Sequence, residues 1–456
     1  MFKDIFKVGS TNIIKMLVSL LVAFVLPKIL TVDDYGFFKL YQFYVTYIGI
    51  SHLGFCDGIY LKYGGKQVKE IDSRKISTEF TSILLFEFII SAVFIIIGIV
   101  IHDFIIISLG LVALPMIMTT FMSFVYQATG EFSRYSKILS TSYFLNFIAF
   151  GALLILRVEL YIPYVIVAIA IEFCSFMMFL TSSIKLLSLK ISKPSIQCLT
   201  KTMKLGILLT LGNTIYALFI GVDKWFIKFT LPFYDFTMYS FAGQMITVVN
   251  MVVTPISLTL YNYFCKRKDQ DFEVKVKRLI VLLLMIMPVL IYCISVVIEY
   301  FLPQYAGAEF AASILIITQI FWGINTAIFV NLYKVYKQQK QYLIRMTISL
   351  GISIILDACV MFICPGTTGY ALATLITTVI YLIINTAHFK YLKPSFKELL
   401  FIIILLGVYV VTLQLPLLYK LTIYLMSYVI LSIVLMREQL VQCISFLSSL
   451  KTKRNT

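Results

Sequence analysis

Residues 78–127 read TEFTSILLFEFIISAVFIIIGIVIHDFIIISLGLVALPMIMTTFMSFVYQ, and this stretch decides the fold. It holds two apolar runs, 78–101 and 104–127, each long enough to cross the roughly 30 Å hydrocarbon core of a bilayer as a helix. Only His102 and Asp103 separate them, so the chain turns back at once. This pattern predicts an integral membrane protein.

The composition extends this prediction to the whole chain. Of 456 residues, 60% are hydrophobic and 13% charged, whereas soluble domains have about 45–50% apolar and about 25% charged residues. Fourteen apolar segments are long enough to span, which leaves no room for a second, soluble domain. They lie near 9–30, 38–61, 78–101, 104–127, 138–156, 160–184, 206–228, 233–264, 279–301, 307–332, 346–364, 367–389, 399–416 and 419–436.

The formal charge of +16 follows from membrane orientation. If the N-terminus is cytoplasmic, thirty-one of the 38 Lys and Arg residues fall in cytoplasmic segments, as the positive-inside rule requires. The split predicts an even number of helices with both termini cytoplasmic, and it explains the charge without nucleic acid. The other seven are Lys15, Lys28, Lys39, Arg157, Lys224, Lys228 and Lys420.

Motifs for soluble chemistry are missing from the sequence. Gly64-Gly65-Lys66 lacks the spacing and the hydroxyl of a phosphate-binding loop. The three histidines are isolated, and the eight cysteines form no C-x-x-C pair. We therefore expect no nucleotide hydrolysis, no metal and no cofactor. Lys15 interrupts the first apolar run, and no small-residue cleavage site follows it, so we expect this segment to be retained.

The chain contains a weak internal repeat. At an offset of 201 residues Asn12 aligns with Asn213, and at 207 Tyr126 and Tyr135 align with Tyr333 and Tyr342. We expect an all-α protein with two six-helix lobes related by a pseudo-two-fold axis along the membrane normal. The expected parts are an N-terminal lobe at 1–190, a basic cytoplasmic linker at 191–205, a C-terminal lobe at 206–392, and two additional helices with a basic tail at 393–456.

Polar residues inside the predicted spans are the candidates for function, because a charge in hydrocarbon is costly. The first helix of each repeat carries a polar stripe at helical spacing, and its lysines would attract an anionic head group. These substrate-binding candidates are Asn12, Lys15, Asn213, Tyr216, Asp223 and Lys224. Asp223 and Lys224 also fit a local pair in which Asp223 orients Lys224.

Three acidic residues deep in other helices, Glu87, Glu172 and Asp357, are candidates for ion coupling or for structural hydrogen bonds. Asp57 fits better as a helix-end residue beside a cytoplasmic loop. Four basic residues lie near enough to an interface to extend toward water. These four are Lys28, Lys39, Arg157 and Lys228.

Several stretches resemble the polysaccharide-exporter (Wzx-type) flippases of the multidrug/oligosaccharidyl-lipid/polysaccharide superfamily. They are Pro27–Gly36 (PKILTVDDYG), Gly54–Gly58 (GFCDG), Gly130–Tyr135 (GEFSRY) and the pair Asp223-Lys224. The resemblance covers about 1–392, and its motifs are loose. It implies two six-helix lobes around a cationic cavity that moves an undecaprenyl-pyrophosphate-linked oligosaccharide, such as an O-antigen or capsule unit, between leaflets of a bacterial inner membrane. The two added helices depart from the commoner twelve-helix form, though fourteen helices occur in the branch resembling lipid II flippases. Whether the added helices form a lipid groove is a question that the resemblance leaves open.

Two other functions are weighed against this one. A multidrug or cation antiporter of the same superfamily would need a mainly acidic cavity, whereas the first and seventh helices supply lysines. A polysaccharide polymerase or ligase would need a large outside loop for its catalytic groups, and the outside loops are short. We therefore expect a transporter rather than an enzyme. The polymerase and chain-length proteins of the same pathway are its expected partners.

Overall fold

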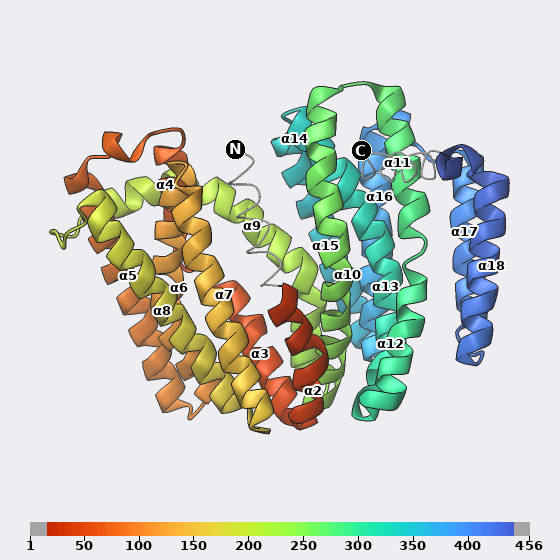
Figure 1. Cartoon of the computed structure of the whole chain (residues 1–456), viewed down its shortest axis with the longest axis horizontal. Coiled ribbons are helices and arrows are strands. Elements are labelled where there is room, and N and C mark those ends of the chain that lie inside the picture. The colour runs from red at the N-terminus through yellow and green to blue at the C-terminus, as the bar shows by residue number, and fades with distance from the viewer. Residues whose placement is uncertain (1–15, 442–456) are drawn as a thin grey trace, which may run out of the picture. The chain divides into compact units, whose positions relative to one another are not determined.

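The computed structural model describes residues 16–441, and within them every regular element is a helix (Figure 1). Ten helical stretches in this range are long and apolar enough to cross a membrane. The remaining predicted spans are mainly helical where the structure describes them, and the span at 38–61 is interrupted between Ile48 and Phe55. The chain is a polytopic, all-α membrane protein, as the sequence predicts.

The chain forms two compact units, residues 1–220 and 221–456. The boundary falls inside one long helix, α9, and the basic stretch that the sequence analysis treats as a linker is helical from Ile196 onward. The lobe boundaries expected from the sequence stay a prediction. The elements up to this helix are η1 (Leu21–Val25), α2 (Leu26–Ile29), α3 (Val32–Ile48), α4 (Phe55–Tyr63), η2 (Val68–Glu70), α5 (Ser73–Val100), α6 (Phe104–Ala128), α7 (Phe132–Ile155), α8 (Tyr161–Leu187) and α9 (Ile196–Thr230).

The second unit continues from the last part of α9. Its final two helices, α17 and α18, pack side by side (Figure 1). Its elements are α10 (Phe233–Lys266), α11 (Gln270–Leu284), α12 (Pro288–Phe301), η3 (Pro303–Ala308), α13 (Glu309–Ile324), η4 (Asn325–Phe329), α14 (Val330–Val335), α15 (Gln339–Ile363), α16 (Thr367–His388), η5 (Lys390–Leu392), α17 (Phe396–Thr412) and α18 (Leu417–Leu435).

The repeat at an offset of 207 residues has a structural counterpart in the turn that follows the fourth helix of each repeat. The amide of Glu131 donates to the carbonyl of Tyr126 at 2.8 Å, and the amide of Gln338 donates to that of Tyr333 at the same distance. The preceding residue has a positive φ in both turns, 78° at Gly130 and 55° at Lys337. Each helix therefore ends in the same way, with one residue in the left-handed conformation and one hydrogen bond that closes the turn.

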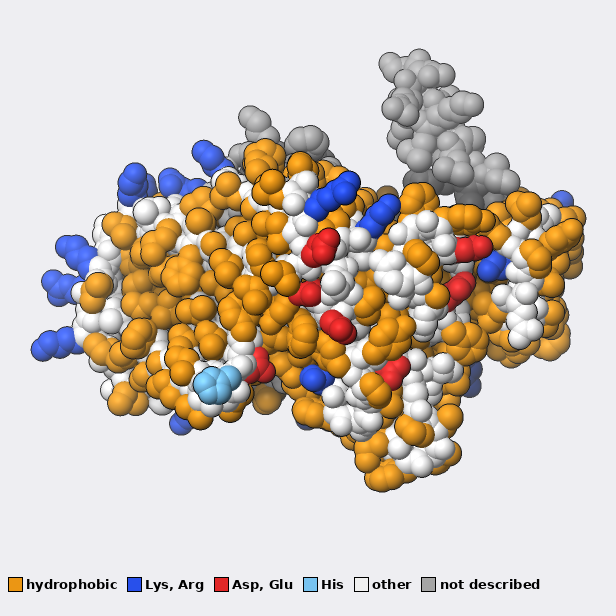
Figure 2. Space-filling model, turned by 90° about the horizontal axis from the view of Figure 1, so that it is seen from below, with side chains coloured by type: hydrophobic (Ala, Val, Ile, Leu, Met, Phe, Trp, Pro, Cys, Tyr) orange, Lys and Arg blue, Asp and Glu red, His pale blue; other side chains and the backbone are white. Residues whose placement is uncertain are grey.

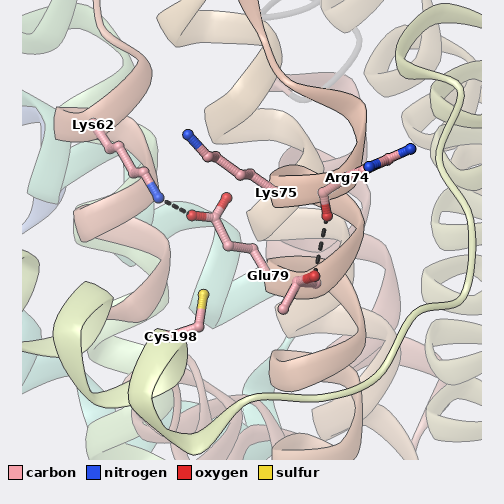
Figure 3. A pocket seen from close by; sticks show the side chains of 6 residues that line it. Lys62, Arg74, Lys75, Glu79 and Cys198 are labelled. Atoms are coloured by element: carbon pink, nitrogen blue, oxygen red, sulfur yellow. Dashed lines mark hydrogen bonds and ion pairs between the residues drawn. The ribbon is translucent and has the colours of Figure 1, made fainter.

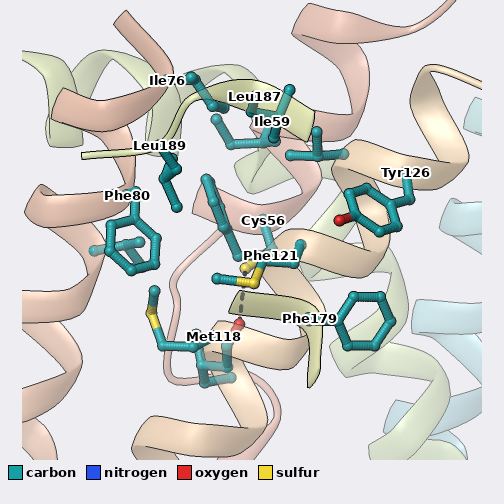
Figure 4. Packing of buried hydrophobic residues seen from close by; sticks show 14 of the residues in the cluster. Cys56, Ile59, Ile76, Phe80, Met118, Phe121, Tyr126, Phe179, Leu187 and Leu189 are labelled. Atoms are coloured by element: carbon teal, nitrogen blue, oxygen red, sulfur yellow. Dashed lines mark hydrogen bonds between the residues drawn. The ribbon is translucent and has the colours of Figure 1, made fainter. Parts of the chain in front are cut away.

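The core of the first unit surrounds α6 (Figure 4). Met118, Phe121 and Tyr126 on α6 are almost fully buried against residues of α4, α5 and α8. Glycines let neighbouring helices approach closely, as is common in membranes. A Cβ atom on Gly206 of α9 would lie 2.1 Å from the carbonyl oxygen of Gly54, so this contact requires glycine.

The outer surface is apolar. Hydrophobic side chains cover much of the face seen in Figure 2. Along α5, Phe88 and Ile96 are 60% and 61% exposed. Such exposure is unfavourable in water and ordinary for a helix that contacts lipid.

The second predicted helix is interrupted. The span expected at 38–61 divides into α3 and α4, and the chain between them takes positive φ values at Leu53 (46°) and Gly54 (91°). Asp57 therefore lies in the first turn of α4 and is buried, where it accepts a hydrogen bond from Thr210. The apolar run shows no sign of this break, so the sequence predicts Asp57 at a helix end beside a cytoplasmic loop.

The segment that follows α8 is fixed to α5 by a row of hydroxyl groups. Backbone amides of this segment donate to Ser77, Thr81 and Ser82 at 2.9–3.1 Å. The hydroxyl of Ser73 donates to the carbonyl of Ser188 at 2.9 Å. Three amides and one carbonyl of residues 188–195 thus find hydrogen-bond partners without forming a helix. These bonds hold the segment that leads into α9. The amides belong to Lys190, Ser192 and Ser195.

Candidate ion and substrate site

A polar cluster lies inside the second unit and is centred on Asp223 of α9. The carboxylate of Asp223 is 4% exposed and accepts hydrogen bonds from the hydroxyls of Tyr239 on α10 and Thr374 on α16, the latter at 3.0 Å. It also accepts one from the backbone amide of Lys224 at 2.7 Å. Three bonds of this kind satisfy a buried carboxylate without an ion pair.

Asp357 of α15 is the second carboxylate of the cluster. It is fully buried and close enough to Asp223 for their charges to repel. The Ser353 hydroxyl lies near it, one turn earlier on α15, but neither carboxylate oxygen makes a well-aligned hydrogen bond with the described residues. Burial of an unpartnered carboxylate is costly, so this side chain requires a bound proton, cation or water.

Hydroxyl groups of α16 complete the cluster. Tyr370 and Thr374 lie one helical turn apart, and the Tyr370 hydroxyl lies 2.9 Å from that of Thr230 at the end of α9. Four helices, α9, α10, α15 and α16, therefore supply oxygen atoms to one buried region. An all-oxygen set with two carboxylates suits a proton or a hard cation such as sodium. Among the described residues no group of three or more His, Cys, Asp and Glu could hold a metal ion.

The structure separates the roles of Asp223 and Lys224, which the sequence analysis treats as a local pair. Within the described residues the Lys224 ammonium makes no ion pair with Asp223, and the bond between the two residues uses the Lys224 backbone amide. The ammonium instead lies beside Gly243 of α10, where an added Cβ atom would be 3.3 Å from it. Lys224 as a residue is partly exposed, while its ammonium group lies deep among neighbouring atoms.

The other predicted substrate residues lie elsewhere. Asn213 and Tyr216 belong to the first unit and are exposed on α9. Asn12 and Lys15 lie outside the described residues. Their role as substrate contacts stays a prediction.

The two other acidic candidates belong to the first unit. Glu87 of α5 is fully buried and accepts a hydrogen bond from Ser51 at 3.0 Å, in the break between α3 and α4. Glu172 of α8 is only partly buried. Of the three coupling candidates, Asp357 is the one that the structure places beside Asp223.

Sequence reasoning missed the hydroxyl partners of this cluster. Tyr370 and Thr374 have the i, i+4 spacing of one helix face, which is a weak signal in a chain rich in Tyr and Thr.

Lys39 differs from its prediction. The sequence predicts that its side chain extends to a membrane interface, but Lys39 is 6% exposed, and its ammonium donates to Gln42 at 3.0 Å. Tyr35 and Phe38 rings lie within 6 Å of that ammonium and cover it.

No protein-family model matches the chain. No curated protein matches its sequence. Solved structures do match. One described as the lipid II flippase MurJ in an inward closed conformation superposes with a TM-score of 0.71 at 15% identity, covering 96% of this chain and 100% of that one.

A second solved structure gives a shorter match. It is described as the inward-facing conformation of a multidrug resistance MATE family transporter of the MOP superfamily, with a TM-score of 0.55 at 11% identity, covering 84% of this chain and 95% of that one. Residues 393–456 are a larger share of this chain than the part that the flippase match leaves out, so the flippase match extends into these residues. The chain therefore has the fold of a lipid II flippase structure, which it shares over a shorter length with a MATE transporter structure.

Proposed function

We propose that this protein is a flippase that moves polyprenyl-pyrophosphate-linked oligosaccharide units across a bacterial cell membrane, from the cytoplasmic to the outer leaflet. The observation that carries the proposal is the match over almost the whole chain, additional helices included, to a lipid II flippase structure. O-antigen or capsule units are the proposed cargo, as the sequence resemblance implies. The distribution of Lys and Arg supports a cytoplasmic position for both termini.

Lys224 and Lys15 are the proposed contacts for the pyrophosphate. Lys224 supports this role because the residue is partly exposed and its ammonium makes no ion pair among the described residues. A fixed positive charge lowers the cost of bringing a pyrophosphate into the low dielectric of the membrane. The polyprenyl tail can stay in lipid throughout.

Coupling to a cation gradient is proposed at Asp223 and Asp357. Binding of a proton or a sodium ion would relieve the repulsion between these carboxylates and supply the partner that Asp357 lacks within the described residues. Because α9, α10, α15 and α16 all contribute to the cluster, its occupancy would change how these helices pack. This links ion binding to a conformational equilibrium.

Deletion of the gene tests the transport function. The expected result is loss of surface polysaccharide, with lipid-linked units retained in the cytoplasmic leaflet. Complementation with Lys224→Ala should restore little polymer at equal protein level, whereas Lys228→Ala, one turn further along α9, is the matched control. Normal polymer in the deletion strain together with increased sensitivity to cationic drugs would contradict the proposal and favour an antiporter.

A further inference from the structure

A small cavity lies at the basic end of the first unit, where α4 ends and α5 and α9 begin (Figure 3). Its volume is about 220 Å³, below the roughly 300 Å³ at which pockets for drug-sized ligands start. A single head group suits this size. The lining residues are Lys62, Arg74, Lys75, Thr78, Glu79 and Cys198.

The acidic residue of this cavity is already satisfied. Glu79 is fully buried, and its carboxylate forms an ion pair with Lys62 and accepts a hydrogen bond from the hydroxyl of Tyr63 at 2.7 Å. Both carboxylate oxygens are therefore engaged. An ammonium group has three donors, so Lys62 keeps donors for a second anion.

Lys75 adds a second positive charge. In Figure 3 the side chains of Lys62 and Lys75 extend toward the same side of Glu79, while the guanidinium of Arg74 points away. Lys75 forms an ion pair with Asp72 at 3.9 Å, and both side chains are at least half exposed. Such a pair contributes little, so Lys75 remains available to bind an anion.

The surroundings strengthen the attraction for anions. Residues 62–75 carry five Lys and Arg against two acidic residues, and residues 185–204 carry five Lys and no acidic residue. The cavity draws its lining from both stretches. Clustered charge of one sign concentrates counter-ions at a surface.

An apolar surface leads away from the cavity along α5. Thr78, Leu85 and Ile89 have the i, i+7 and i+11 spacing of one helix face. Leu85 and Ile89 are 47% and 54% exposed, and they face lipid in a membrane. A molecule with a phosphate at the cavity could thus lay a hydrocarbon chain along this face, which a soluble phosphate cannot do.

We propose that the cavity between α4, α5 and α9 binds the phosphate of an anionic membrane phospholipid through Lys62 and Lys75, with an acyl chain along Leu85 and Ile89. Basic pockets between membrane helices on the cytoplasmic side are a known setting for anionic head groups. The bound lipid would hold the ends of α4, α5 and α9 together. It is separate from the transported substrate and needs only that the chain spans a membrane.

Native mass spectrometry of the full-length protein, released from nanodiscs of phosphatidylglycerol and phosphatidylcholine, tests the proposal. Wild-type protein should retain phosphatidylglycerol in preference to phosphatidylcholine. Lys75→Gln should lower its occupancy about five-fold, the effect of about one lysine contact at a membrane surface. Arg74→Gln removes the same charge from the adjacent residue, whose guanidinium points away from Glu79, and should lower the occupancy clearly less than Lys75→Gln. Equal losses in both variants, or equal retention of both lipids, would overturn the proposal.

Two further measurements are needed. One distinguishes a lipid phosphate from a soluble phosphate, and the other distinguishes this lipid site from the proposed transport function. Excess inorganic phosphate should leave the bound phosphatidylglycerol in place, because it lacks the acyl chain; full displacement would instead assign a site for soluble phosphate. Asp357→Asn, which removes a carboxylate of the proposed coupling site, should retain the lipid, so a failed transport experiment leaves this one interpretable. Lys62 is not substituted, because its loss would leave Glu79 buried without its ion pair.

Discussion

The hydroxyl of Tyr424 in α18 donates a hydrogen bond of 2.5 Å to the backbone carbonyl of Met285, at the point where the helix formed by α11 and α12 is interrupted. Near this break the amide of Val289 bonds to Ile286 instead of Met285. Tyr428, one turn along α18, donates to Leu282 at 2.9 Å in the same way. The additional helices thus satisfy carbonyl groups that Pro288 and the break release inside the membrane.

Tyr424→Phe should therefore destabilise the second unit. The Met285 carbonyl would remain in an apolar environment without a hydrogen-bond donor, which costs about 1–3 kcal/mol. Thermal unfolding of the purified protein in lipid nanodiscs measures the change. Tyr419→Phe is the control, because Tyr419 lies on the same helix and is 65% exposed; equal effects of both variants would show that the Met285 bond contributes nothing.

Lys277 and Glu398 form a buried ion pair of 2.8 Å between α11 and α17, with exposures of 4% and 2%. Lys277 also donates to the carbonyl of Leu392 at 2.9 Å. Lys277→Met should cost about 3–5 kcal/mol, because it leaves a buried carboxylate without its main partner. Adding Glu398→Gln should recover most of this loss. A double variant no more stable than Lys277→Met would contradict a direct pairing.

Asp357→Asn should remove ion-dependent stabilisation without harming the fold, since the Asp357 carboxylate has no hydrogen-bond partner in the described part of the chain to lose. In the wild type, a bound cation at 100 times its Kd adds about 2.7 kcal/mol of stability. Melting temperatures with sodium, with lithium and at low pH measure this effect. Glu172→Gln is the matched control, and a cation response that survives in Asp357→Asn would exclude this residue as the coupling site.

Gly206→Ala tests the close approach of α9 to α4. An added Cβ would lie 2.1 Å from the carbonyl oxygen of Gly54, and overpacking of this kind costs about 1–3 kcal/mol or more. Gly151→Ala in α7 is the control, because its Cβ would meet nothing within 4 Å in the described structure. That change should be neutral or stabilise by about 0.5–1 kcal/mol. Similar stability of the two variants would mean that the two helices separate without cost.

The hydroxyl row on α5 predicts a pattern of hydrogen exchange. Replacement of Ser77, Thr81 and Ser82 by Ala, Val and Ala should speed exchange at the amides of Lys190, Ser192 and Ser195, which bond to these hydroxyls. Ser108→Ala is the control, because the Ser108 hydroxyl bonds within its own helix. Unchanged exchange in residues 188–195 would show that other contacts hold this segment.

The membrane class and the approximate places of most helices follow from the sequence alone. Apolar runs of about 20 residues have one stable form in hydrocarbon, because each backbone group must be bonded within its own segment. The runs at 78–101 and 104–127 therefore became α5 and α6 with small changes at their ends. Tyr126 and Tyr333 revealed a repeat because the turns that follow them have the same geometry.

Which polar residues meet depends on the tertiary structure. Asp223, Tyr239, Asp357 and Thr374 are up to 151 residues apart along the chain, and no local spacing relates side chains on four different helices. The break between α3 and α4 was equally invisible, because its positive φ values depend on packing rather than on the apolar pattern. Periodicity records which face of a helix is buried, but the partner of each buried polar group is set by helix packing, which depends on contacts distant in sequence.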